Sequence, residues 1–216
     1  MVLFTKPLLY TNYFPAAANY HMTHAVEGKK MEELTYEKLA SMKPSELDQV
    51  LENGTAPSLE SIAGYEFRGY NVLPGPAHFV MWLLSNVRFI KCFFQKEGDP
   101  PISEAEHIHG YNLKVKRGGL NEPWTCNPGD EKPDRIGHYR VHPKRHREPF
   151  DEYPHAVFLD YNLPVNNFFT GKTIEDYLVK VSPGNEDLLL GKAYFRAGFI
   201  RSPSFFILER LQRHER

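Results

Sequence analysis

The chain has 216 residues, 41% of them hydrophobic, and a formal net charge of −1. A chain of this length can bury one well-packed core, and barrels of such a size are commonly single domains. Because the charges nearly cancel, there is no global field of the kind that drives non-specific binding to nucleic acid or to anionic membranes. We therefore expect one main domain and no nucleic-acid partner.

Cysteine usage and hydropathy bear on the compartment. The chain contains only two cysteines, Cys92 and Cys126. They are too few for a disulfide framework and suit a reducing environment. No stretch approaches the roughly 18 to 20 apolar residues that a membrane helix needs. These features predict a soluble, cytoplasmic protein without a membrane span, and they leave the oligomeric state open.

Two segments precede the first expected strand. Prolines interrupt the apolar core that a signal peptide would need in residues 1–30, which are expected to form a loosely ordered arm. Residues 31–62 carry spaced leucines among polar residues and predict two short helices, with Ser45 as an N-cap and Gly54 as a C-terminal stop. We expect this segment to cap one end of a barrel; a regulatory or partner-binding helix is the alternative.

Short apolar-aromatic runs separated by turn residues recur through the rest of the chain and predict antiparallel strands. A short internal helix is expected at 77–84. The pattern predicts a mainly β protein, in which residues 63–211 form a single antiparallel up-and-down barrel of about eight to ten strands. The expected strands lie at 63–72, 88–95, 109–117, 136–142, 155–162, 177–181, 188–195 and 205–209.

Alternation within the early strands predicts which side chains enter the barrel. Tyr65 and Phe67 share one face of the first strand, as expected for a half-buried strand with a period of two. The clearest alternation places His109, Tyr111 and Leu113 together on an apolar face, which we expect to point inward. An inward histidine is either a core residue with both nitrogens satisfied or a polar anchor for a ligand.

Asp160 is the most informative acidic residue. If its strand neighbours Ala156 and Phe158 point inward, Asp160 does so too. A carboxylate in that position must be paired or hydrogen-bonded. Arg140 or a histidine of the neighbouring strand, such as His138, is the expected partner.

Motifs that carry chemistry are weak in this chain. His107 and His109 have the H-x-H spacing with which one strand face can ligate a metal, but the glutamate of a cupin-type site does not follow them. The basic cluster at 138–147 is expected to be a solvated strand end balanced by nearby acidic residues. The sequence contains neither a G-x-S-x-G elbow nor a Gly-rich phosphate loop. We therefore expect no metal and no cofactor.

One resemblance to a known family is carried by short motifs. The segment from Gly64 to Gly69 resembles the entry motif of the bacterial GXWXG-type family, with Phe67 in the place of tryptophan. The tail resembles that family's companion C-terminal domain, in segments at 157–164, 174–181, 190–193 and 205–210. The resemblance implies a calycin-like barrel, the broad group that includes lipocalins and fatty-acid-binding proteins. It implies no catalytic residues.

The leading functional prediction is a lipocalin-like binding protein that holds a small, largely apolar or amphipathic, lipid-like ligand inside the barrel. An isomerase- or hydratase-like barrel enzyme with an internal set of Asp, His and Arg is one alternative. A protein-interaction module with a filled barrel is the other. The residues expected to line or anchor the ligand are Tyr65, Phe67, His109, Tyr111, His138, Arg140, Phe158 and Asp160.

Overall fold

A computed structural model of the chain describes residues 33–72, 87–143, 153–167, 173–197 and 200–215. The chain divides into two units, Met1–Glu33 and Leu34–Arg216, and every element described below belongs to the second. The expected N-terminal arm and the expected helix at 77–84 lie outside the described residues.

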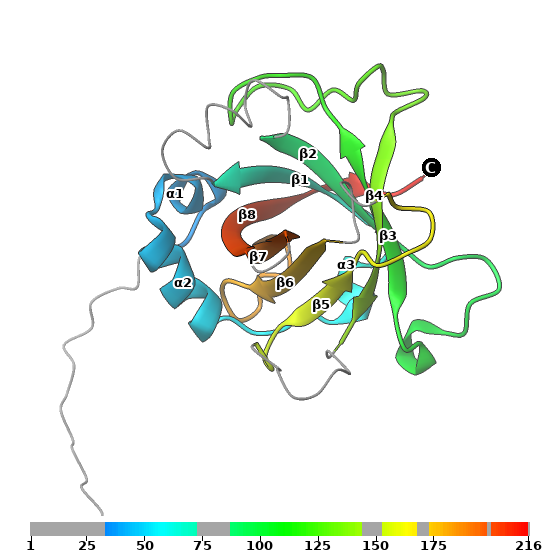
Figure 1. Cartoon of the computed structure of the whole chain (residues 1–216), viewed down its shortest axis with the longest axis horizontal. Helices are drawn as coiled ribbons and strands as arrows, with labels where there is room; N and C mark the ends of the chain where they lie inside the picture. Colours follow the sequence, from blue (N-terminus) through cyan, green and yellow to red (C-terminus); the bar gives the residue numbers. More distant parts are fainter. Residues whose placement is uncertain (1–32, 73–86, 144–152, 168–172, 198–199, 216) are drawn as a thin grey trace, which may run out of the picture. The chain divides into compact units, whose positions relative to one another are not determined.

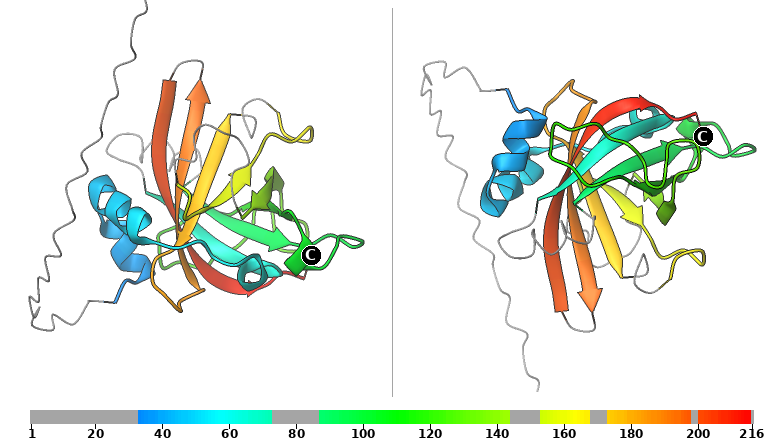
Figure 2. Two further views of the ribbon diagram at one scale, coloured as in Figure 1. Left: turned by 90° about the horizontal axis from the view of Figure 1, so that it is seen from below. Right: turned by 90° about the horizontal axis from the view of Figure 1, so that it is seen from above.

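Eight strands form a closed antiparallel barrel in sequence order, which confirms the predicted fold class (Figure 1). Each strand pairs with its neighbour in the chain, and the last pairs back with the first. Figure 2 shows the last two strands as a long hairpin that extends past their neighbours. The strands are β1 Tyr65–Val72, β2 Arg88–Phe94, β3 Ile108–Lys114, β4 Arg135–His142, β5 Val157–Asp160, β6 Ile174–Lys180, β7 Leu188–Ala197 and β8 Ile200–Arg213.

Contacts between strands that are not neighbours show which side chains point inward. Lys91 of β2 reaches Asp176 of β6, and Phe93 of β2 packs edge-on against Tyr139 of β4 with ring centroids 5.8 Å apart. Since successive side chains in a strand alternate between faces, the pairing register then assigns the rest of the interior. Phe67, for example, is the register partner of Lys91 and also points inward.

The interior differs between its two ends. At the end where β1 begins, the short helix α3 (Leu59–Ile62) contributes Leu59 and Ile62 to the apolar cluster inside the barrel. Inward side chains near this end, such as Ile108 and Leu208, are fully buried. Toward the other end the inward side chains are only partly buried, and we call them the partly exposed half of the interior: Asn71, Phe89, Asn112, Ile174, Ala193 and Ser204.

Two further helices, α1 (Tyr36–Ser41) and α2 (Pro44–Asn53), pack against the outside of the barrel wall rather than over an end. Their buried side chains form one cluster with the outward-facing side chains of β6, β7 and β8. Only α3 therefore lies where a cap was expected. The apolar residues of this cluster include Tyr36, Leu39, Leu47, Leu51, Tyr177, Val179, Leu190 and Ile207.

The ends of α2 follow local chemistry. Gly54 is its C-cap, as predicted, but the predicted N-cap Ser45 lies inside the first turn. Lys43 is the N-cap instead, because Pro44 has the backbone conformation that suits the first helical position and lacks an N–H that would need a partner. The Glu46 side chain accepts the Lys43 N–H at 2.7 Å. None of the described helices is long and apolar enough to cross a membrane.

Candidate functional site

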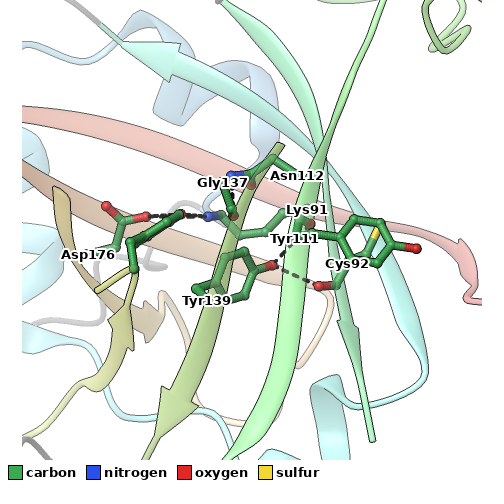
Figure 3. Close-up of polar contacts among 8 residues, drawn as sticks. Lys91, Cys92, Tyr111, Asn112, Gly137, Tyr139 and Asp176 are labelled. Atoms are coloured by element: carbon green, nitrogen blue, oxygen red, sulfur yellow. Dashed lines mark hydrogen bonds and ion pairs between the residues drawn. The ribbon is translucent and has the colours of Figure 1, made fainter. Parts of the chain in front are cut away.

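A lysine lies in the middle of the barrel interior. Lys91 is 1% exposed, and its neighbours on the inward face of β2 are Phe89 and Phe93. Its ammonium donates to the Tyr161 hydroxyl at 2.6 Å. It also lies 3.3 Å from Asp176 Oδ2 (Figure 3). Tyr161, which follows β5, also donates to Asp176 Oδ2 at 2.8 Å. The three side chains form a polar triangle inside an otherwise apolar barrel.

Aromatic rings surround this ammonium. A cation over the face of an aromatic ring is attracted by the ring quadrupole, and the attraction strengthens when water is absent. The Lys91 Nζ lies 4.6 Å, 5.0 Å, 5.3 Å and 5.6 Å from the centroids of Tyr139, Phe206, Tyr161 and Phe89. The arrangement therefore satisfies the cation from several sides at once.

Two oxygen atoms in the interior are not satisfied. Within the part of the chain that the structure describes, Asp176 Oδ1 and Asn112 Oδ1 are buried without a hydrogen-bond partner. Such atoms are rare in native proteins, because each costs the free energy of removing it from water. Both are acceptors. A group placed beside them would therefore have to donate hydrogen bonds.

Burial weakens the charges of the central pair. Removal from water lowers the pKa of Lys91, although Asp176 opposes that shift. Removal from water likewise raises the pKa of Asp176, although Lys91 and Tyr161 oppose it. Since both shifts favour the neutral forms, a proton moves between the two groups at a lower cost than it would in water.

The residues predicted as a site divide between the two faces of the barrel wall. Tyr65 and Phe67 point inward as expected, since they alternate with Glu66 and face the same side as their register partners Phe93 and Lys91. The other six point outward, so the expectation that they face the interior is wrong. They are His109, Tyr111, His138, Arg140, Phe158 and Asp160.

The outer face of β3 has its own apolar cover. Trp124 and Cys126, in the connection between β3 and β4, pack on Tyr111 and Leu113. The clean alternation in this strand therefore marks an outer surface that is covered by a loop. His109 belongs to this face, where its Nε2 lies 3.3 Å from Asp99 Oδ2.

Asp160 is also on the outer face. It is opposite Arg140 in the pairing of β4 with β5, so the predicted proximity of the two residues is confirmed although their predicted orientation is not. Its Oδ1 accepts the backbone N–H of Asn162 at 2.9 Å. The carboxylate thus stabilises the turn after β5.

Sequence reasoning missed the central pair, although a signal was present. Lys91 alternates with Phe89 and Phe93, and Asp176 alternates with Ile174 and Leu178. A charged residue on the apolar face of a strand needs a buried partner. The same requirement predicts a buried partner for Asp160, but Asp160 faces outward and Asp176 is the buried carboxylate.

Three outward histidines make the stability of the fold depend on pH. Burial lowers the pKa of His107, His109 and His138, so the folded chain binds fewer protons near these groups than the unfolded chain does. This stability is complete above the unfolded pKa of about 6.5 and is lost as the pH falls below it. We expect denaturant midpoints measured along a pH series to fall below that value.

Two variants check this assignment. His109→Gln should flatten the decline, whereas Asp99→Asn should deepen it, because Asp99 opposes the lowering of the His109 pKa. An unchanged pH profile in both variants would assign the decline to other groups.

Comparison of the sequence with protein-family models and with curated proteins found no match. The structure therefore defines the class of protein: a mainly β, closed eight-stranded antiparallel up-and-down barrel, the architecture that lipocalins use. Within that class, this chain is marked by a lysine-aspartate pair buried inside the barrel.

Proposed function

We propose that the protein binds a small, largely apolar ligand in the partly exposed half of the barrel interior, next to Lys91 and Asp176. The observation that carries the proposal is the buried pair itself, in which Asp176 Oδ1 lacks a partner among the described residues. A buried ion pair is often no more stabilising than apolar side chains of similar volume. A pair that is not needed for stability and leaves an acceptor unused is therefore better explained by a bound molecule.

The chemistry of the interior limits the ligand. Asp176 Oδ1 and Asn112 Oδ1 call for a donor such as a hydroxyl or an amide N–H. Phe89, Ile174 and Ala193 offer apolar surface in the partly exposed half. The ligand would thus have an apolar body and one donating head group, as a long-chain alcohol or a primary fatty amide has. We include in this proposal a relationship to the GXWXG-type family, which the segment from Gly64 to Gly69 suggests. That family is expected to have a calycin-like barrel, a class that includes binders of apolar ligands.

A second candidate is a barrel enzyme that moves a proton. Its support is the pair of opposed pKa shifts, lowered for Lys91 and raised for Asp176. A general acid or base works best with a pKa near the working pH. Conversion of a bound compound to an isomer or hydrated product by the wild type but not by Lys91→Met would favour the enzyme; unchanged compound would favour the binding protein.

The test uses ligands of equal chain length and different head groups. Native mass spectrometry of the freshly purified chain should show a retained small molecule, and calorimetric titration should rank the alcohol and the amide above the methyl ester, which cannot donate. Asn112→Ala should weaken binding of the alcohol by about 10-fold. That factor corresponds to the loss of one neutral hydrogen bond whose strength is near the upper end of the usual range.

Asp160→Asn is the matched control for Asp176→Asn. Both replace a strand carboxylate by its isosteric amide, but Asp160 faces outward. We expect Asp176→Asn to weaken binding by roughly 10- to 100-fold, since hydrogen bonds to charged groups are the stronger ones, and Asp160→Asn to leave it unchanged. Equal effects of the two variants, or no adduct and no thermal shift with any of the ligands, would rule the proposal out.

A further inference from the structure

A second cluster lies on the outer face of β1 and β2, separate from the barrel interior. It contains Glu66, Cys92 and His214, and the nitrogen, sulfur and oxygen atoms that these residues could offer to a metal all lie within 4.8 Å of one another. Glu66 and Cys92 are register partners on adjacent strands, and His214 directly follows β8. Three segments of the chain thus bring three different metal-ligand types together.

Hydrogen bonds bring candidate metal-binding atoms of Glu66 and His214 next to each other. Glu66 Oε2 accepts from Gln212 Nε2 at 2.8 Å, while Oε1 lies 3.0 Å from His214 Nδ1. The other ring nitrogen of His214 lies 3.4 Å from the Tyr111 hydroxyl. Metal-bound histidines usually place their second nitrogen against such a partner, which fixes the tautomer and the ring orientation. Glu66 Oε1 and His214 Nδ1 therefore face each other directly, within 4.8 Å of the Cys92 sulfur.

Burial and charge also fit a divalent cation. Glu66 and Cys92 are fully buried, and the His214 side chain is 6% exposed. One thiolate and one carboxylate together cancel the charge of a divalent ion, so a loaded site would be neutral. Without an ion, a buried carboxylate carries a cost in free energy that its hydrogen bonds must offset.

We propose that Glu66, Cys92 and His214 bind one Zn²⁺ ion through Oε1, Sγ and Nδ1. Zinc binds oxygen, sulfur and nitrogen ligands, at about 2.0–2.3 Å, and prefers four of them in a tetrahedron. Donors at those bond lengths lie roughly 3.3–3.8 Å apart, so small side-chain shifts bring the cluster to that geometry. A water completes the four ligands. Binding releases the thiol proton of Cys92 to solvent and displaces the proton on His214 Nδ1 that faces Glu66 in the empty site, so the other ring nitrogen becomes the donor toward Tyr111. The metal then replaces the contact between Glu66 and His214.

A cavity lies beside the chain segment that carries His214. It has a volume of about 370 Å³ and is bordered by Gln212, Arg213 and Glu215, which flank His214 in the chain, and by Asp130, Glu131 and Arg135 near the start of β4. Its three carboxylates outnumber its two arginines, so the lining is weakly acidic. A bound ion would join the end of β8 to β1 and β2, across the seam where the barrel closes. Metal binding should therefore stabilise the fold by an amount that grows with the logarithm of its affinity.

The experiment uses the full chain, freed of metal with a chelator and then titrated with ZnCl₂ and separately with CoCl₂. We expect one equivalent of zinc by elemental analysis, a rise in melting temperature on zinc addition, and a thiolate-to-cobalt charge-transfer band with Co²⁺. Cys92→Ala should abolish that band. His214→Ala, a change near the chain end that spares the strands, should weaken zinc by more than the roughly 10- to 100-fold that loss of an outer partner costs.

Cys126→Ala is the matched control, because Cys126 is also buried on the outer face beside Tyr111 but does not belong to the cluster. It should keep the cobalt band and the zinc affinity. Absence of bound zinc in the wild type would overturn the proposal, as would a cobalt band that survives Cys92→Ala or zinc binding unaffected by His214→Ala. Asp176→Asn should bind zinc like the wild type, so failure of the interior ligand site and failure of the metal site are separately visible.

Discussion

Lys91→Met is expected to lower the free energy of unfolding by about 3–5 kcal/mol, the usual cost of removing one partner of a buried ion pair. The methionine side chain nearly fills the space of the lysine stem, so the loss does not come from a cavity. It comes from Asp176, which is 3% exposed and would keep Tyr161 as its remaining hydrogen-bond donor within the polar triangle. Urea or guanidinium unfolding monitored by circular dichroism measures the change.

The pH dependence of this variant has a definite sign. Without Lys91, the pKa of Asp176 lies still further above its ordinary value, so the folded variant binds more protons than its unfolded chain. The contribution of Asp176 to stability is then greatest below the unfolded pKa of about 3.9 and is lost as the pH rises through the folded pKa. The stability deficit of Lys91→Met relative to the wild type should therefore shrink as the pH is lowered toward about 4, which is close to the ordinary pKa of an aspartate.

A triple variant separates charge from packing. Lys91→Met, Asp176→Val and Tyr161→Phe together remove the whole polar triangle and leave no charge or hydroxyl unpaired. Replacement of a buried ion pair by apolar side chains is often neutral or stabilising, so we expect the triple variant to recover most of the loss while losing ligand binding. A single Lys91→Met variant as stable as the wild type would show that the pair is not a desolvated ion pair.

The order and type of the strands could be predicted from the sequence, because each strand carries its own period-two pattern and turn residues. Which face points inward could not be predicted for β3, since Tyr111 and Leu113 are apolar on its outer face. That face is buried by Trp124 and Cys126, from a connection with no regular pattern of its own. An apolar stripe shows that something covers a strand, but not on which side of the wall the cover lies.

The central pair needed information that only closure of the barrel supplies. Lys91 lies among apolar residues on both faces of β2, so its strand shows no clear alternation. Its partner Asp176 is 85 residues away in the chain and on a strand across the barrel. The same holds for Glu66 and His214, which meet only because β8 pairs with β1. Local patterns can flag such residues individually, whereas their pairing depends on the register of distant strands.

Phe206→Ala is expected to lower the free energy of unfolding by about 3–5 kcal/mol, as large-to-small changes of buried phenylalanine do. Phe206 is 2% exposed, its ring packs edge-on against Phe89 at 6.1 Å, and its face lies 5.0 Å from the Lys91 ammonium. Truncation should therefore also open space beside Lys91. We expect faster modification of Lys91 by an amine-reactive reagent, read by peptide mass spectrometry under conditions where the variant stays folded.

Phe205→Ala is the control for that experiment, because Phe205 is 4% exposed but packs on the outer face with the helices. It should destabilise the fold by a similar amount without exposing Lys91.

A double-mutant cycle of Phe206 with Gly191 tests whether the two residues are in contact. A Cβ on Gly191 would lie 2.0 Å from Phe206 Cζ, so Gly191→Ala alone should cost about 1–3 kcal/mol by overpacking.

In the Phe206→Ala background the clash is gone, and Gly191→Ala should cost little or even regain stability by filling part of the cavity. Residues in contact typically show interaction energies of about 0.5–3 kcal/mol in such cycles. Additive effects of the two substitutions would mean that Phe206 does not lie over Gly191. In that case the Phe206 ring would also not border Lys91. The side chains around Lys91 in the partly exposed half of the interior would then differ from those on which the ligand proposal rests.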